Sequence, residues 1–110
     1  MATEPVFTYA VEKSRDDLGN NVTTIKCHGR LVNENASRIK EVIKPLIVDG
    51  GRIIIDLGEL SYLDSSGLGA LVGLKVSALN KGFCRLELEN LTPRVKELLS
   101  LANLTKLFSS

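Results

Sequence analysis

A continuous run of β-branched residues in the middle of the chain constrains the fold more than any other feature. Ile53, Ile54 and Ile55 follow one another within residues 52–57, without the alternation of apolar and polar positions that a half-exposed strand would show. Such a run is typical of a strand buried on both faces, because parallel strands covered by helices have no solvent side. We therefore expect this strand at the centre of a sheet that is flanked by helices.

Two other segments alternate with a period of two, as strands with one exposed face do. Residues 22–28 and residues 83–89 both place apolar or small side chains on one face and polar side chains on the other. A dense cluster of turn-forming residues at 16–21 precedes the first of them. These features predict an N-terminal hairpin, with a short edge strand around Val6, Phe7 and Tyr9 and with Gly29 at its end.

Apolar residues recur at helical spacing between and after these strands. Residues 36–47, 68–79 and 93–102 each gather them on one face, which predicts three amphipathic helices. Pro45 lies late in the first pattern and predicts a kink or a short final turn there. Thr92, followed by proline, is typical of a helix N-cap.

The element order defines the fold class. A second, shorter extended piece is expected at residues 60–63, after the central strand. The order β-β-α-β-α-β-α implies parallel crossovers around an initial hairpin, and thus an α/β fold with a mixed sheet of about four to five strands flanked by helices. The length of 110 residues leaves room for one domain, over residues 1–110.

Charge and composition exclude several classes of function. Lys and Arg number 14 against 13 Asp and Glu, so we expect no nucleic-acid partner held through its phosphates. No apolar run approaches the roughly 18 residues of a membrane span, and residues 1–5 lack the features of a signal peptide, so we expect a cytoplasmic protein without membrane insertion. Cys27 and Cys84 have no metal-ligand spacing; they are expected as buried thiols, with a disulfide or redox role as the alternative.

The stretch from Asp64 to Gly69 contains the candidate functional residues. It lies where an extended segment gives way to a helix, so the hydroxyl of Ser65 is expected at or near the N-cap. In the simplest interpretation, Asp64, Ser65 or Ser66 only caps this helix. In the alternative, Ser65 is a phosphorylation site, because a phosphate at a helix N-terminus is stabilised by the backbone N–H groups and the helix dipole.

Three glycines at the start of this helix need a physical cause. Gly67, Gly69 and Gly73 each cost about 1 kcal/mol relative to alanine in a helix. Close packing on the sheet and close approach of a partner backbone are both sufficient reasons. A dinucleotide-binding turn is the third interpretation, and the separation of ten positions from Leu57 to Gly67 argues against it.

Other enzymatic interpretations fit less well. Ser65 is not preceded by the glycine of a hydrolase nucleophile elbow, and His28 is a lone histidine on the polar face of an early strand. Asp56 and Asp64 would be the acidic ligands of a Mg²⁺ site, but a carboxylate at a strand end is more often a turn or cap residue. We therefore expect no catalytic residue and no metal site.

The turn and its surroundings resemble the STAS domain family, and in particular its single-domain anti-sigma factor antagonists. Residues 63–69 match the family's hydrophobic–Asp-Ser-Ser/Thr-Gly-Leu-Gly turn residue for residue. Ile53–Leu57 before the turn, Gly29 at the end of the second strand, and the leucines of 86–91 and 95–108 agree as well. The resemblance covers essentially the whole chain and implies a STAS-like mixed sheet.

The resemblance implies a switch and not an enzyme. In that family the unphosphorylated antagonist binds an anti-sigma factor that is also a serine kinase, and this releases a sigma factor for transcription. The kinase, with its own ATP and Mg²⁺, would phosphorylate Ser65, and a serine phosphatase would reset the protein. Asp64 and Ser66 would support the phosphosite, and the chain itself would carry no cofactor.

The resemblance also implies a partner-binding surface. Its residues would be Gly29, Arg30, Val32, Asn33, Asn35, Ser61, Tyr62, Gly67, Leu68 and Gly69. Many members have acidic residues at the positions of Arg30 and Val32, so this loop departs from the family pattern. The departure favours an alternative role, a STAS adaptor subunit of another signalling or lipid-transport complex without phospho-switching. No sequence feature indicates the oligomeric state.

Overall fold

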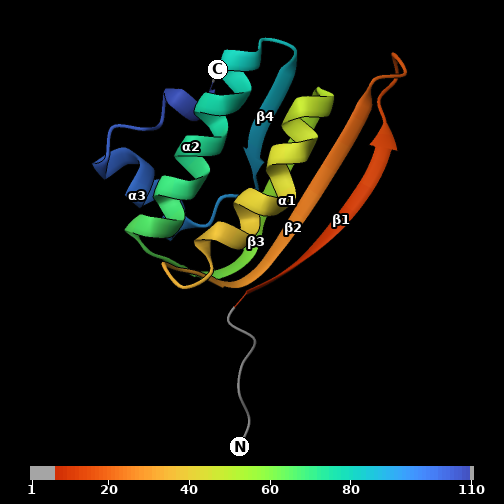
Figure 1. The fold of residues 1–110 in the computed structure, drawn as a ribbon. Helices are drawn as coiled ribbons and strands as arrows, with labels where there is room; N and C mark the ends of the chain where they lie inside the picture. Colours follow the sequence, from red (N-terminus) through yellow and green to blue (C-terminus); the bar gives the residue numbers. More distant parts are fainter. Residues whose placement is uncertain (1–6, 110) are drawn as a thin grey trace, which may run out of the picture.

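Four strands form one mixed sheet in the spatial order β1-β2-β3-β4 (Figure 1). The structure is a computed structural model that describes residues 7–109. The elements are β1 (Phe7–Arg15), β2 (Asn21–Leu31), α1 (Ala36–Asp49), β3 (Gly51–Leu63), α2 (Ser65–Lys81), β4 (Cys84–Glu89), α3 (Pro93–Leu101) and the 3-10 helix η1 (Leu107–Ser109). Strand β1 is antiparallel to β2, whereas β2, β3 and β4 are parallel to one another. The predicted α/β class and element order are confirmed.

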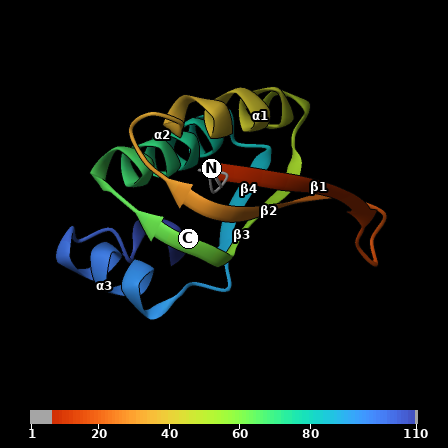
Figure 2. The same ribbon diagram turned by 90° about the horizontal axis from the view of Figure 1, so that it is seen from below.

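Helices α1 and α2 pack side by side on one face of the sheet (Figures 1 and 2). Each is the crossover between two neighbouring parallel strands, which explains why both lie on the same layer. Helix α3 lies apart from this pair, near the carboxyl end of β3 and the first turns of α2 (Figure 2). The carboxyl ends of β2 and β3 and the N-terminus of α2 therefore meet at one end of the molecule.

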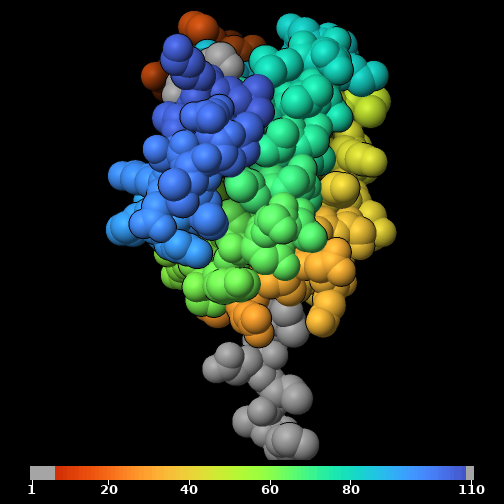
Figure 3. Space-filling view, turned by 90° about the vertical axis from the view of Figure 1, so that its left-hand side faces the viewer, coloured from red at the N-terminus to blue at the C-terminus, as the bar shows by residue number. Residues whose placement is uncertain are grey.

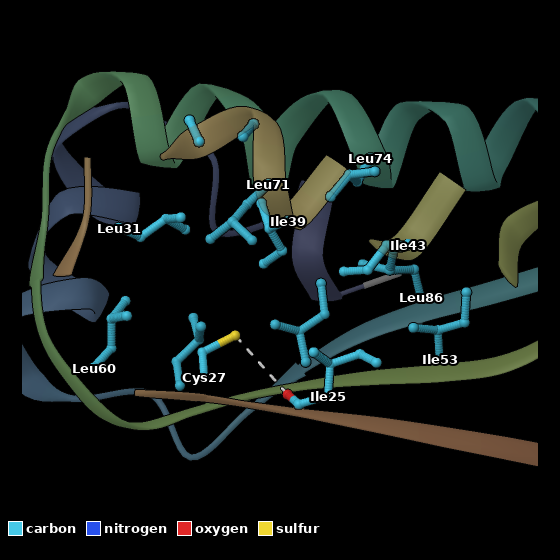
Figure 4. Packing of buried hydrophobic residues seen from close by; sticks show 14 of the residues in the cluster. Ile25, Cys27, Leu31, Ile39, Ile43, Ile53, Leu60, Leu71, Leu74 and Leu86 are labelled. Atoms are coloured by element: carbon cyan, nitrogen blue, oxygen red, sulfur yellow. Dashed lines mark hydrogen bonds between the residues drawn. The ribbon is translucent and has the colours of Figure 1, made fainter. Parts of the chain in front are cut away.

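Most of the core lies between the sheet and helices α1 and α2, and Val95 and Leu99 of α3 belong to the same cluster. Figure 4 shows side chains from β2, β3 and β4 pointing toward those of α1 and α2. The labelled residues of this cluster are Ile25, Cys27, Leu31, Ile39, Ile43, Ile53, Leu60, Leu71, Leu74 and Leu86. Ile54, on the opposite face of β3, is only 8% exposed, so the predicted burial of the central strand on both faces is confirmed.

The strands are longer than the sequence predicts. β2 continues through Gly29 to Leu31, and β3 continues through Gly58 to Leu63, so the predicted second extended piece is part of β3. The reason is their parallel pairing, which runs on past irregularities in register to join Leu31 with Leu63. Gly29 has a φ of 94° and bends the strand at one such irregularity without ending it. β1 is also longer than the expected edge strand, and Val6 lies outside the described residues.

The helix boundaries agree with the predicted signals. Helix α1 continues through Pro45 for one last turn to Asp49, which agrees with the short final turn predicted there. The Thr92 side chain accepts a hydrogen bond from the Val95 N–H at 3.3 Å, which confirms the N-cap of α3. Among residues 7–109, no helix is long and apolar enough to cross a membrane.

Both cysteines are buried and free, as expected from the sequence. Burial raises the pKa of the Cys27 thiol to about 12, and it also raises the pKa of Cys84. We therefore expect the folded protein to react with a thiol reagent at pH 8 far more slowly than the urea-unfolded chain, at both positions. Rapid modification of the folded protein, read by mass spectrometry, would contradict this burial.

Candidate functional site

The N-terminus of α2 is built by Asp64, the one residue between β3 and the helix. Its side chain accepts a hydrogen bond from the Gly67 N–H at 2.8 Å, so Asp64 is the N-cap. Ser65 is the first residue of the helix and lies next to the cap, in agreement with the predicted position at or near the N-cap. The cap is thus made by the carboxylate, which leaves the Ser65 hydroxyl uninvolved in capping.

Asp64 also ties this helix to the loop between β2 and α1. Its second carboxylate oxygen accepts a hydrogen bond from the Asn33 N–H at 3.1 Å, and its own N–H donates to the Leu31 carbonyl at 3.3 Å. The backbone N–H groups of Gly67 and Asn33 hold the pKa of the Asp64 carboxyl below its usual value. Asp64 is therefore ionised at neutral pH and holds the two segments in one arrangement.

The loop is shaped from inside by Asn35. Its buried side chain accepts a hydrogen bond from the Val32 N–H at 3.0 Å and donates one to the Arg30 carbonyl at 3.0 Å. Asn35 stands at the N-cap position of α1, but its side chain makes no cap hydrogen bond. Among the predicted partner-binding residues, Asn35 therefore shapes the loop and offers no exposed side chain.

Gly67 allows the loop and the helix to come this close. A Cβ atom at Gly67 would lie 2.3 Å from the Leu31 carbonyl oxygen and 2.8 Å from a Leu63 methyl carbon. The predicted close packing is therefore correct for Gly67. It is wrong for Gly69 and Gly73, where a Cβ would meet no atom within 4 Å, because both lie on the exposed side of α2.

The contact between Gly67 and the Leu31 carbonyl also argues against a dinucleotide-binding turn. β3 leads almost directly into α2, so the separation between strand and glycines that argued against a dinucleotide turn does not exist. The space beside Gly67 is instead filled by the Leu31 carbonyl of the chain itself. Gly67 therefore allows a close contact with the chain's own backbone, and no room is left beside it for the phosphate of a bound dinucleotide.

Two adjacent serines differ in their environment. The Ser66 hydroxyl donates a hydrogen bond to the Asn33 side-chain oxygen at 3.2 Å, and Ser66 is half-buried. Ser65 is exposed, and within residues 7–109 its hydroxyl has no hydrogen-bond partner. Only the Ser65 hydroxyl of this pair is thus free to react with a molecule from solution.

An apolar groove begins at Ser65. It has a volume of about 250 Å³ and lies between the first turns of α2 and helix α3, which are neighbours on the face shown in Figure 3. Its lining residues are Asp64, Ser65, Leu68, Leu98, Leu101 and Ala102. On the α3 side, Leu98 and Ala102 belong to the predicted apolar stripe of that helix, whereas Leu101 lies off the stripe, is largely exposed and was not indicated by the sequence.

The remaining predicted residues lie at the adjacent strand ends. Arg30 and Tyr62 are register partners on β2 and β3, and the guanidinium lies 5.3 Å from the centre of the Tyr62 ring. The Ser61 hydroxyl donates a hydrogen bond to the Gly29 carbonyl at 3.0 Å. The fold therefore brings the loop, these strand ends and the start of α2 to one end of the molecule.

The weaker interpretations find little support in the geometry. Asp56 accepts hydrogen bonds from the Gly58 N–H at 2.9 Å and from the Asn90 side chain at 3.0 Å, as a turn residue does. His28 is exposed and lies 3.9 Å from the Glu59 carboxylate, on a polar part of the sheet. In the described part of the chain, no group of three or more His, Cys, Asp or Glu side chains could hold a metal ion.

Comparison with known proteins decides the family. The model of the STAS domain matches residues 6–110. The chain belongs to the STAS domain family. An anti-sigma-B factor antagonist of Staphylococcus aureus is 33% identical over 84 residues, which are 76% of this chain and 77% of that protein. A STAS-domain containing protein of Pseudomonas aeruginosa is 29% identical over 85 residues, which are 77% and 83% of the two chains.

Solved structures of anti-sigma factor antagonists share the fold. The anti-sigma factor antagonist SpoIIAA in its unphosphorylated form superposes with a TM-score of 0.70 at 25% identity, over 91% of this chain and 84% of that one. An anti-sigma factor antagonist from Mycobacterium paratuberculosis gives a TM-score of 0.73 at 22% identity, over 93% and 82% of the chains. The fold is thus SpoIIAA-like, with a four-stranded mixed sheet and three α-helices in the residues described.

Proposed function

We propose that this STAS domain is an anti-sigma factor antagonist that is switched by phosphorylation of Ser65. Unphosphorylated, it binds an anti-sigma factor that is also a serine kinase, and this binding releases a sigma factor for transcription. A serine phosphatase restores the binding form. The observation that carries the proposal is the exposed Ser65 hydroxyl, without a hydrogen-bond partner in residues 7–109, on the first turn of a helix whose cap is already supplied by Asp64.

The position of Ser65 suits a phosphate that changes the surface without unfolding the domain. Backbone N–H groups at the start of the 17-residue helix α2 carry partial positive charge and stabilise an anion. A phosphate adds a charge of roughly −1.5 to −2, which would turn the formal net charge of +1 into a net negative one.

The groove beside Ser65 supplies the physical basis of the switch. Leu68, Leu98 and Leu101 offer a partner an apolar contact that begins at the serine itself. A phosphate at the rim would have to lose water when a partner covers this groove, and an ionised group pays heavily for that loss. The proposed surface of this chain that contacts the partner extends from the loop at Arg30–Asn33, over Ser61 and Tyr62, to Leu68 and Gly69.

A second candidate function is a STAS adaptor that binds its partner without phosphorylation. The observation that favours it is Arg30, whose side chain stacks on Tyr62 at the edge of the same surface. This places a cation where the family pattern has an acidic residue, which suits a different partner.

Phosphorylation of single-serine variants tests the proposal. We expect the wild-type chain to gain one phosphate from a serine-kinase anti-sigma factor of the same genome, with ATP and Mg²⁺, as read by intact mass. Ser65→Ala should abolish this gain, whereas the matched variant Ser66→Ala should retain it, because only the Ser65 hydroxyl is free. Equal phosphorylation of Ser65→Ala and wild type would refute Ser65 as the site. No phosphate with any such kinase, together with tight binding of one of them, would instead support the adaptor.

A further inference from the structure

The outer edge of β1 offers backbone groups to another strand. β1 stands at one end of the strand order, and all nine of its residues pair with β2 along one side only. In Figure 1 it forms the border of the sheet, and neither α1 nor α2 crosses its outer side. The Phe7 carbonyl accepts a hydrogen bond from Arg38 at 3.0 Å. In the described residues no second strand pairs with β1, and such an edge is a template for strand pairing.

Two partly exposed apolar side chains stand along this edge. Tyr9 is 39% exposed and Val11 is 42% exposed. They share a face with the buried Phe7, because alternate residues of a strand point to the same side. Their side chains therefore continue the apolar surface of the core to the border of the sheet, where a neighbouring strand would cover them.

We propose that β1 pairs in antiparallel fashion with β1 of a second copy of this chain, about a two-fold axis at Ala10. The pairing joins two four-stranded sheets into one continuous sheet. In this register Tyr9 lies opposite Val11 of the partner subunit, and the symmetry repeats the pair on the other side of the axis. Aromatic and β-branched residues in opposite positions are favourable cross-strand pairs.

This register places each described charge of β1 opposite an uncharged residue. Glu12 would lie opposite Thr8 of the partner subunit, and Lys13 opposite Phe7 of the partner subunit, so that no like charges meet. An axis at Glu12 or at Lys13 would instead place two like charges opposite each other, which is destabilising. Glu12 also has its charge balanced within the chain, since it lies 3.3 Å from the Lys26 ammonium. The paired strands themselves therefore add no like-charge repulsion, whereas Lys13 would approach the partner subunit's Arg38, whose guanidinium lies 6.0 Å from the centre of the Phe7 ring.

β1 and the proposed phosphorylation site lie on different elements, although Phe7 at the start of β1 pairs with Gly29 of the proposed partner-binding surface. Helix α2, which carries Ser65, packs on β4 at the other border of the sheet. The pair would carry one Ser65 on each subunit, and thus two binding sites for partners. This bivalence would raise the apparent affinity for an oligomeric partner without any new contact.

Sedimentation equilibrium of the whole chain tests the association. We expect a monomer–dimer equilibrium in the micromolar range or weaker, because one strand pair buries less than a standard interface. Val11→Lys should weaken the association at least tenfold, since it places an ammonium in the apolar pair. Val48→Lys, at an exposed position on α1, should leave it unchanged. A monomer at every concentration up to millimolar, or a Val11→Lys variant that associates like wild type, would overturn the proposal.

Disulfide trapping tests the register. Ala10 would face its own copy across the axis, with Cβ atoms about 4.5–5.5 Å apart, which a disulfide bridges with a small shift. Ala10→Cys should therefore oxidise to a covalent dimer, while the buried Cys27 and Cys84 stay reduced. The control Ser14→Cys is exposed on the same strand, but its two copies would lie at opposite ends of the pair. Equal trapping of both variants would refute this register.

Discussion

A Gly67→Ala variant is expected to lose about 3 kcal/mol of unfolding free energy, at the upper end of the usual cost of overpacking. The added methyl group would lie 2.3 Å from the Leu31 carbonyl oxygen, well inside van der Waals contact. This oxygen cannot move away alone, because it accepts the Asp64 N–H and belongs to the strand pairing between β2 and β3. The variant must therefore shift the loop or the first turn of α2.

The other two glycines of α2 are the matched controls. A Cβ at Gly69 or Gly73 meets no atom within 4 Å. Each substitution by alanine should raise the unfolding free energy by up to about 1 kcal/mol, because alanine loses less backbone entropy in a helix. Urea unfolding followed by circular dichroism measures all three variants. A Gly67→Ala protein as stable as Gly69→Ala would show that the loop yields freely and that the close approach has no structural importance.

The fold could be predicted because the pattern of apolar and polar residues along each segment indicates which of its faces are buried. The three consecutive isoleucines of β3 and the alternation in β2 follow directly from the number of faces that each strand buries. The strand ends could not be predicted in the same way. Gly29 and Gly58 are breakers by local propensity, but the hydrogen bonds that carry the strands past them come from residues about thirty positions away.

The candidate site could be located from the sequence, but its construction could not. The Asp64–Gly69 stretch marked the place, yet several nearby residues were equal candidates for capping and for close packing. Asp64 is distinguished from Ser65 by a hydrogen bond to Asn33, which lies 31 positions away in the sequence. Gly67 is distinguished from Gly69 by the Leu31 carbonyl. Both distinctions depend on tertiary contacts that no local pattern encodes.

Lys75 is a charged residue that is buried on the apolar face of α2. Its side chain is 1% exposed in the middle of α2, and its ammonium group donates a hydrogen bond to the Leu86 carbonyl at 2.7 Å. Burial lowers the pKa of Lys75 from its usual value of 10.5, and the carboxylate of Glu87 partly opposes this shift. The domain thus holds an ammonium at the helix–sheet interface at some cost in free energy.

Truncation at this position should have a large effect on stability. Lys75→Ala is expected to lower the unfolding free energy by about 3 kcal/mol, because it leaves a cavity and removes the donor from the buried Leu86 carbonyl. Lys75→Met retains a long apolar stem and should recover much of this loss, although the carbonyl stays without that donor. Equal destabilisation by alanine and methionine would assign the whole effect to the hydrogen bond and none to packing.

The pH dependence separates the charge of Lys75 from its packing. Between the lowered pKa of the folded state and the unfolded value of 10.5, the unfolded chain binds more protons at this group than the folded protein does. Stability from this group therefore rises as the pH increases through that window. We expect the unfolding free energy of wild type, measured relative to Lys75→Met in urea at matched pH values, to increase from neutral pH toward pH 10.5. A constant difference would mean that the ammonium in the folded state is as well solvated as in the unfolded chain, in conflict with its burial beneath α2.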